Sequence, residues 1–109
     1  MATKAQQPLV SIVSINYDQP EVTCEMLQSL REVTYPNFET LIVDNASPTT
    51  SSDIIKEKYP EVQLIISKKN LGFAGGNNIA LKQAKGDYVL LLNNDTEVKP
   101  NFLDSLVEL

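Results

Sequence analysis

The chain has 109 residues and a net charge of −5, with 42% apolar and 21% charged residues. A chain of this length forms at most one domain, and it should bury about 65% of the surface that it exposes when unfolded. The acidic balance, with Arg31 as the only arginine, argues against nucleic acid as a partner, because phosphate backbones are bound by clustered Lys and Arg. The absence of histidine excludes histidine-based catalysis, and the single cysteine, Cys24, excludes an internal disulfide.

Since no apolar leader follows Met1, we expect a cytoplasmic protein.

Four short runs rich in Val, Ile and Leu predict β-strands, because each is bounded by polar residues or proline. The runs cover residues 9–15, 39–43, 62–66 and 88–92. The last run has five consecutive apolar residues, which is typical of a strand buried on both faces of a parallel sheet.

Helix-length segments lie between these runs and after the last one. The first begins at Pro20, and its residues Val22, Met26, Leu30 and Val33 predict one apolar face. The other segments follow Ser51-Ser52-Asp53, cover about residues 74–85 before Gly86, and begin near Phe102. Strand and helix alternating four times predict an α/β fold in which right-handed crossovers build a mainly parallel sheet.

A polar loop follows each predicted strand, at residues 16–18, 44–47, 68–72 and 93–95. In the predicted topology these loops share one edge of the sheet, the edge at which open α/β sheets bind ligands. Each loop alone is also compatible with ordinary turns and helix caps, since Asn, Asp, Ser and Gly are common turn residues. Four such loops at one edge together favour a binding site.

Two phosphate-binding motifs are missing from this edge. No G-x-G-x-x-G follows the first strand, and no G-x-x-x-x-G-K-[ST] occurs. The charge of a phosphorylated ligand would therefore be met by a metal ion and by side chains, with Asp95 as the candidate metal ligand.

Four segments carry a resemblance to a known family. They are Val10-Ser-Ile-Val-Ser-Ile-Asn-Tyr17, Leu41-Ile-Val-Asp-Asn-Ala-Ser47, Asn70-Leu-Gly-Phe-Ala-Gly-Gly-Asn-Asn78 and Gly86-Asp-Tyr-Val-Leu-Leu-Leu-Asn-Asn-Asp95. In this order they resemble the nucleotide-sugar-binding half of a family 2 glycosyltransferase, an inverting enzyme with the GT-A fold, and in particular the rhamnosyltransferase-like branch in bacteria. The resemblance begins at about Pro8 and implies a Rossmann-like three-layer α/β/α fold with a mainly parallel sheet, truncated at the C-terminus.

The resemblance implies roles for residues at the sheet edge. Asn16 and Tyr17 would help to hold base and ribose, and Asp44 would accept a charge-assisted hydrogen bond from the base. Asp44 could otherwise be a turn residue. Gly75 and Gly76 are as consistent with close backbone packing as with ligand contact. The implied nucleotide-binding residues are Asn16, Tyr17, Asp44, Asn45, Asn70, Gly72, Asn77, Asn93 and Asn94.

Asp95 matches the last position of the family's D-x-D motif, whose carboxylate binds the Mg2+ or Mn2+ that bridges the diphosphate. Asn93 stands at the first position in place of Asp, and the lost negative charge predicts weaker metal binding. The alternative is that residues 93–95 form a polar turn leading to a helix at Pro100.

The resemblance also implies a reaction, the direct displacement of a nucleoside diphosphate from a sugar by an acceptor hydroxyl. The donor would be a UDP-, dTDP- or GDP-linked sugar, and the acceptor a glycan or a lipid-linked glycan of the bacterial cell surface. In the family the catalytic base lies in the acceptor half, beyond residue 109, so no catalytic residue is assigned here.

We expect residues 1–7 to be disordered or tag-like and residues 8–109 to form the donor half of a longer enzyme that works at the inner face of the membrane. The apolar residues near Leu109 predict self-association through the last helix.

Two other classes of protein are compatible with parts of the pattern. A receiver-like signalling domain shares the parallel sheet, but it would need paired acids where Asn16-Tyr17 stands. A non-catalytic binding or scaffold module could use the same fold, since fold alone does not decide activity.

Overall fold

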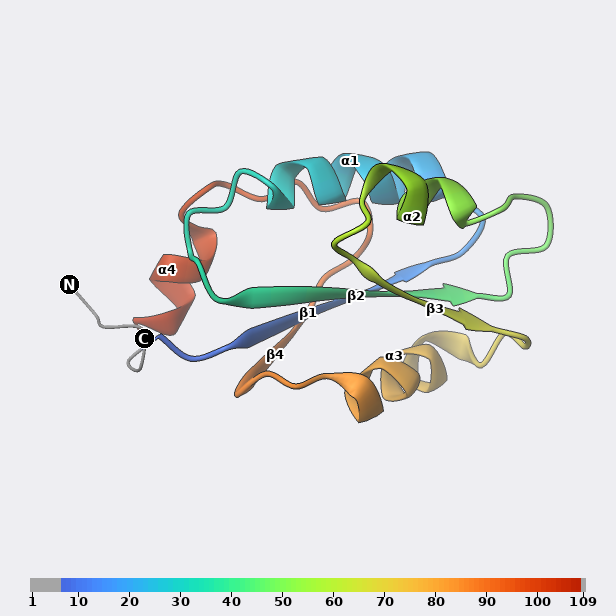
Figure 1. The fold of residues 1–109 in the computed structure, drawn as a ribbon. Coiled ribbons are helices and arrows are strands. Elements are labelled where there is room, and N and C mark those ends of the chain that lie inside the picture. The colour runs from blue at the N-terminus through green and yellow to red at the C-terminus, as the bar shows by residue number, and fades with distance from the viewer. Residues whose placement is uncertain (1–6, 109) are drawn as a thin grey trace.

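The structure is a computed structural model that describes residues 7–108 (Figure 1). Four parallel strands form one sheet in the order β3-β2-β1-β4. They are β1 (Val10–Asn16), β2 (Phe38–Asn45), β3 (Gln63–Ser67) and β4 (Tyr88–Leu91). The four predicted strands are thus confirmed, with bounds that differ by at most two residues. The segment 1–7, predicted to be disordered, lies outside the described residues except for Gln7.

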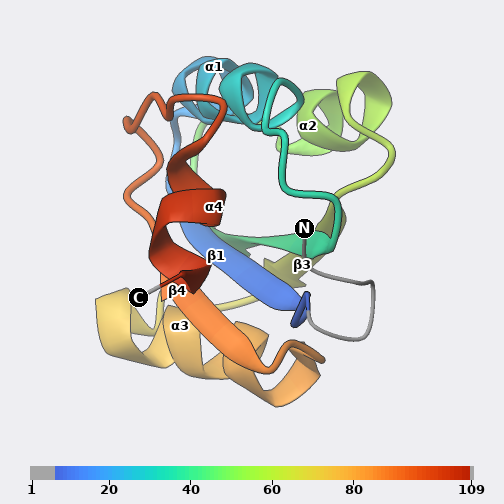
Figure 2. The same ribbon diagram turned by 90° about the vertical axis from the view of Figure 1, so that its left-hand side faces the viewer.

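Helices cover both faces of the sheet, so the predicted three-layer α/β/α arrangement is confirmed (Figures 1 and 2). One face carries α1 (Pro20–Leu30) and α2 (Asp53–Lys58), and the opposite face carries α3 (Gly72–Gln83). A short helix, α4 (Phe102–Val107), joins the core on the α1 side through the buried Leu103. Helix α1 ends at Leu30, so Val33 lies beyond the helix, although it packs against the same core. Helix α3 covers Gly72–Gln83 rather than about residues 74–85.

The two central strands supply the core on both faces. Consecutive apolar residues suit a parallel strand that is covered by helices on each side, because alternate side chains point to opposite faces. In β2, Ile42 packs toward α1 and α2, whereas its neighbours Leu41 and Val43 pack with Ala80 of α3. The α1 side is the larger core, and its fully buried side chains include Ile12, Met26, Ile42, Ile55 and Leu103.

Strand β4 corrects one expectation from the sequence. It was predicted to be buried on both faces, but Tyr88, Val89 and Leu91 are 58%, 41% and 47% exposed. The reason is its place in the sheet, because within residues 7–108 β4 pairs with β1 alone and lies at the edge of the order β3-β2-β1-β4. Between β4 and α4 lies an apolar cavity of about 270 Å3, lined by Val10, Tyr88, Val89, Leu90, Leu103, Leu106 and Val107.

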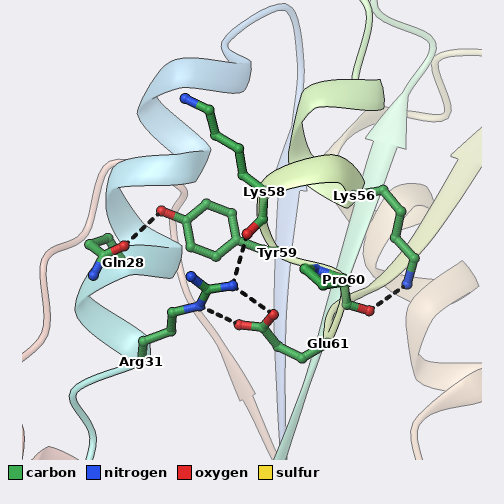
Figure 3. A network of polar contacts seen from close by, with 7 residues as sticks. All are labelled: Gln28, Arg31, Lys56, Lys58, Tyr59, Pro60 and Glu61. Atoms are coloured by element: carbon green, nitrogen blue, oxygen red, sulfur yellow. Dashed lines mark hydrogen bonds and ion pairs between the residues drawn. The ribbon is translucent and has the colours of Figure 1, made fainter.

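A polar network joins the end of α1 to the segment between α2 and β3 (Figure 3). The Arg31 guanidinium donates two hydrogen bonds to the Glu61 carboxylate, from Nε at 2.7 Å and from Nη2 at 2.9 Å, and one to the Lys58 carbonyl at 2.8 Å. It also lies 4.3 Å from the centre of the Tyr59 ring. The hydrogen bonds from Arg31 lower the pKa of Glu61. This network therefore braces α1 against α2 on the side away from the candidate site.

Helix α1 also carries Cys24, whose side chain is buried. Burial raises the pKa of its thiol.

None of the helices within residues 7–108 combines the length and the hydropathy needed to cross a bilayer.

Candidate functional site

The end of the two central strands holds a buried pair of polar side chains. Asn16 and Asp44 are register partners at the last position of the β1–β2 ladder, and Asn16 Nδ2 donates to Asp44 Oδ1 at 3.0 Å. Ser47 Oγ donates to the same oxygen. Asn16 is fully buried and Asp44 is 6% exposed. Within residues 7–108 the structure gives no donor to the second carboxylate oxygen, Oδ2, so Asp44 has one oxygen held by the protein and one free to accept from a ligand.

Two residues in left-handed conformation shape the loops around Asp44. Ala46 has φ 60° and Asp18 has φ 59°, so the chain turns sharply just after β2 and β1. The Asp18 N–H donates to Ser47 Oγ at 2.8 Å, and its carboxylate accepts from the backbone N–H groups of Thr49 and Thr50 at 3.2 and 2.8 Å. Both threonine hydroxyls donate to Asp18 as well, and these bonds lower its pKa. The loops after β1 and β2 are thus joined into one unit.

A threonine of α1 continues the network from the buried pair. Thr23 is fully buried, and its Oγ1 donates to Asn16 Oδ1 at 2.7 Å. The same hydroxyl accepts from Asn94 Nδ2, in the loop after β4, at 3.1 Å. Sequence reasoning missed Thr23, although a polar residue on the inward side of an apolar helix needs a hydrogen-bond partner and so gives a signal.

The loop before α3 is fastened to the end of β2. Asn45 Nδ2 donates to the Gly72 carbonyl, and Asn45 Oδ1 accepts from the Leu71 N–H, both at 3.0 Å. Asn70 Oδ1 accepts from the Gly72 N–H at 2.8 Å, and Gly72 has φ 73°, a conformation that suits glycine. The structure therefore brings together three predicted site residues, Asn45, Asn70 and Gly72, as a connected loop.

Helix α3 lies close against the sheet at its N-terminal end. A Cβ added at Gly76 would come within 2.9 Å of Ile15 Cδ1 and 3.3 Å of Asn45 Nδ2. A Cβ at Gly75 would come within 2.7 Å of Leu71 Cβ. Both glycines thus permit close packing. Asn77 is buried on the same helix.

The end of β4 is open by contrast. A cavity of about 250 Å3 is lined by Ile15, Phe73, Leu92, Asn93, Asn94 and Asp95. Phe73 and Tyr17 are exposed aromatic side chains, and Asn93 and Asp95 are exposed as well. No hydrogen bond within the described residues joins Asp95 directly to Asp44; a line of hydrogen bonds runs from the neighbouring Asn94 through Thr23 and Asn16 to Asp44.

The oxygen atoms near Asp95 suit a hard divalent cation. One carboxylate lies beside the amide side chains of Asn93 and Asn94 around the same cavity. Within residues 7–108 no group of three or more Cys, Asp or Glu side chains could hold a metal ion. This donor set fits Mg2+ or Mn2+, since such ions are often held by one or two carboxylates while ligand phosphates and water complete the shell.

Comparison with known proteins agrees with this architecture. Residues 11–109 match the family description "Glycosyl transferase family 2". The O-antigen biosynthesis protein RfbC of Myxococcus xanthus is 36% identical over 104 residues, covering 92% of this chain and 8% of RfbC. The chain spans 42% or less of the first curated relatives that it matches.

Two solved structures share the fold at 28% and 26% identity. TarS 1-349 of S. aureus in complex with UDP has a TM-score of 0.78, covering 91% of this chain and 31% of that one. The mannosyltransferase PcManGT of Pyrobaculum calidifontis in complex with GDP-Man and Mn2+ has a TM-score of 0.72, covering 82% of this chain and 28% of that one. The chain belongs to glycosyl transferase family 2 and has the GT-A type of α/β fold.

Proposed function

We propose that this chain binds the donor of an inverting glycosyltransferase, a sugar linked to a nucleoside diphosphate. The observation that carries this proposal is the Asp44 carboxylate at the ligand-binding edge of the sheet, with one oxygen held by Asn16 and Ser47 and the other free to accept from a base. Support comes from two relatives of the same fold, TarS in complex with UDP and PcManGT in complex with GDP-Man. The donor here is a UDP-, dTDP- or GDP-linked sugar.

The predicted site residues divide into contact and support roles in this proposal. Both amide atoms of Asn16 and of Asn45 are already hydrogen-bonded within the protein, so these residues hold Asp44 and the loop before α3 in place. Tyr17 follows Asn16 at the end of β1, is exposed, and contacts base or ribose. The other contacts come from Asn70, Gly72, Asn77, Asn93 and Asn94.

Asp95 would hold a divalent cation, Mg2+ or Mn2+, with Asn93 orienting a bound water or a ribose hydroxyl. When bound, the cation neutralises the charge of the departing diphosphate. A single carboxylate predicts that the ion binds with the nucleotide rather than ahead of it, because ligand phosphates complete its shell.

The acceptor side of the reaction lies outside the described residues in this proposal. Neither an acceptor pocket nor a positioned base is assigned within the chain, and these supply much of the rate of such a reaction. We therefore expect no sugar transfer from the 109-residue chain, whereas a longer parent transfers sugar to a glycan or lipid-linked acceptor at the inner face of the membrane. A product assay with donor and crude acceptor tests this, and robust transfer by the purified chain would contradict it.

The exposed apolar residues of β4 and α4 form a surface that another segment can cover. Tyr88, Val89 and Leu106 contribute to it, around the cavity between the two elements. Patches of this kind favour association, so the chain is expected to self-associate when nothing else covers them. Mass measurement in solution checks this, with Leu106→Glu as the variant that should restore the monomer.

Calorimetric titration tests the central proposal. UDP, GDP and dTDP are each titrated into the chain with Mn2+ and, separately, with EDTA. One nucleotide should bind well and only with the cation. Failure of all three to bind in the presence of Mn2+ would overturn the proposal.

A further inference from the structure

A line of hydrogen bonds crosses the ligand-binding edge from the loop after β4 to the end of β2. Asn94 Nδ2 donates to Thr23 Oγ1 at 3.1 Å, Thr23 Oγ1 donates to Asn16 Oδ1 at 2.7 Å, and Asn16 Nδ2 donates to Asp44 Oδ1 at 3.0 Å. We call these four side chains the relay. Its ends are the residue beside Asp95 and the residue proposed to read the base.

The chemistry of each group sets the direction of the relay. An ionised carboxylate only accepts, so Asn16 must turn its NH2 group to Asp44 and its carbonyl oxygen to Thr23. Thr23 must then donate its single hydroxyl proton to Asn16, and it can serve Asn94 only as an acceptor. Asn94 is in turn held with its NH2 group toward the helix. The orientation of Asn94 therefore follows from that of Asp44.

Burial makes this order costly to disturb. Asn16 and Thr23 are fully buried and Asp44 nearly so. A buried polar atom that loses its partner keeps its desolvation penalty, so an inverted amide or a missing hydroxyl is strongly disfavoured. Thr23 is the one member with a single polar atom that both donates and accepts, which makes it the point at which the relay can be cut.

We propose that Thr23 is a positioning residue that couples the two halves of the donor site, so that the base-reading carboxylate of Asp44 and the loop carrying Asp95 are set by one buried hydroxyl. The inference rests on the proposed function, because it assigns base and diphosphate to these two ends. Thr23 itself touches no ligand in this account.

The first experiment compares two substitutions at this position. Thr23→Val keeps the shape of the side chain and removes the hydroxyl, whereas Thr23→Ser keeps the hydroxyl. The probe is whichever of UDP, GDP and dTDP the parent binds best, with Mn2+. Thr23→Val should weaken binding roughly tenfold, since Asn16 and Asn94 lose their shared partner. Thr23→Ser should stay within about twofold of the parent.

A matched control separates the relay from its surroundings. Gln19 Oε1 also accepts from Asn94 Nδ2, at 3.4 Å, but Gln19 is exposed and lies outside the relay. Gln19→Ala should leave nucleotide affinity unchanged. Equal binding by the parent and Thr23→Val would overturn the inference, as would a loss in Thr23→Ser as large as that in Thr23→Val.

A double-mutant cycle with Asn94→Ala and Thr23→Val measures the coupling between these two residues directly. Asn94→Ala should weaken binding of the bare nucleoside, which has no phosphate, severalfold in the parent and clearly less in the Thr23→Val background, where the hydrogen bond between the two residues is already lost. Additive losses would mean that Thr23 acts on fold stability alone and would contradict the inference. If Thr23→Val does not fold, Asn94→Ala decides by itself, because unchanged nucleoside binding then overturns the coupling. If the parent binds no nucleotide, the proposed function fails, and this outcome differs from every result above.

Discussion

The two halves of the ligand-binding edge differ in how far the protein itself completes them. At the ends of β1 and β2, Asn16, Asp44 and Asn45 are buried, and each makes hydrogen bonds within the chain. At the end of β4, Asn93 and Asp95 are exposed around a cavity. Groups held in place before binding lose less entropy when a ligand arrives, so the first half suits selective recognition of a base. The second half suits a cation and phosphates that bring their own ligands.

The largest contrast should appear in fold stability. Ile42 is fully buried at the centre of the sheet, so Ile42→Ala should lower the free energy of unfolding by about 2–5 kcal/mol. Leu91 lies on the edge strand and is half exposed, so Leu91→Ala should cost less than about 1.5 kcal/mol. Urea unfolding measures both. Equal costs would mean that β4 is covered in solution.

Removal of the base-reading carboxylate should give the next largest effect. Asp44→Ala should weaken nucleotide binding by roughly ten- to a hundredfold, about 1.5–3 kcal/mol, because a charge-assisted hydrogen bond is lost in a buried setting. Asp53→Ala, at an exposed position on α2, is the matched control and should bind like the parent. Unchanged affinity in Asp44→Ala would remove this loop from the site.

Nucleotide affinity should fall both when Asp95 is replaced and when a chelator removes the cation. EDTA leaves the diphosphate beside an uncompensated carboxylate, and Asp95→Asn removes the proposed ligand of the cation. Both should therefore reduce affinity at least about tenfold, about 1.4 kcal/mol. Titration calorimetry compares the parent with Mn2+, the parent with EDTA, and the variant with Mn2+. The same affinity in all three would instead indicate a metal-free site in which Lys68 or Lys69 neutralises the phosphates.

The smallest effect concerns a pair outside the site. Arg31 lowers the pKa of Glu61 below its ordinary value of 4.5, so the pair stabilises the fold above that pH and loses its contribution as the pH falls through the lowered pKa. Since the side chains of Arg31 and Glu61 are 41% and 51% exposed, solvent screening should keep the gain below about 1 kcal/mol. Glu61→Gln should therefore flatten the fall in stability below pH 4.5 while leaving nucleotide affinity unchanged. A steeper fall in this variant would contradict the assignment.

Much of the fold could be predicted because its signals are local. Apolar runs and capping residues mark the strands and helices, and their alternation predicts the parallel sheet. The exposure of β4 could not be predicted in this way. Its apolar residues Val89, Leu90 and Leu91 form a run like Leu41, Ile42 and Val43 of β2, and only the strand order places β4 at the edge of the sheet and β2 inside it.

The site shows the same limit. The sequence predicts that Asp44 and Asp95 lie at the same edge of the sheet. It could not show that both amide atoms of Asn16 already form hydrogen bonds within the protein. Thr23 was missed because its partner Asn94 lies 71 residues away along the chain. Pairings of this kind depend on tertiary structure, which single-sequence patterns do not contain.

The buried thiol of Cys24 offers a way to follow the packing of α1 by chemical labelling. Cys24 follows Thr23 in the helix, is 7% exposed, and has a raised pKa, so it is shielded and protonated in the folded chain. Thiol reagents attack the thiolate, and Cys24 lines a cavity between α1 and α2, so its labelling rate depends on how closely these two helices pack. As the chain has no other cysteine, the labelling rate reports the packing of the helix that carries Thr23. A bound nucleotide that strengthens the relay would slow this reaction without any engineered probe.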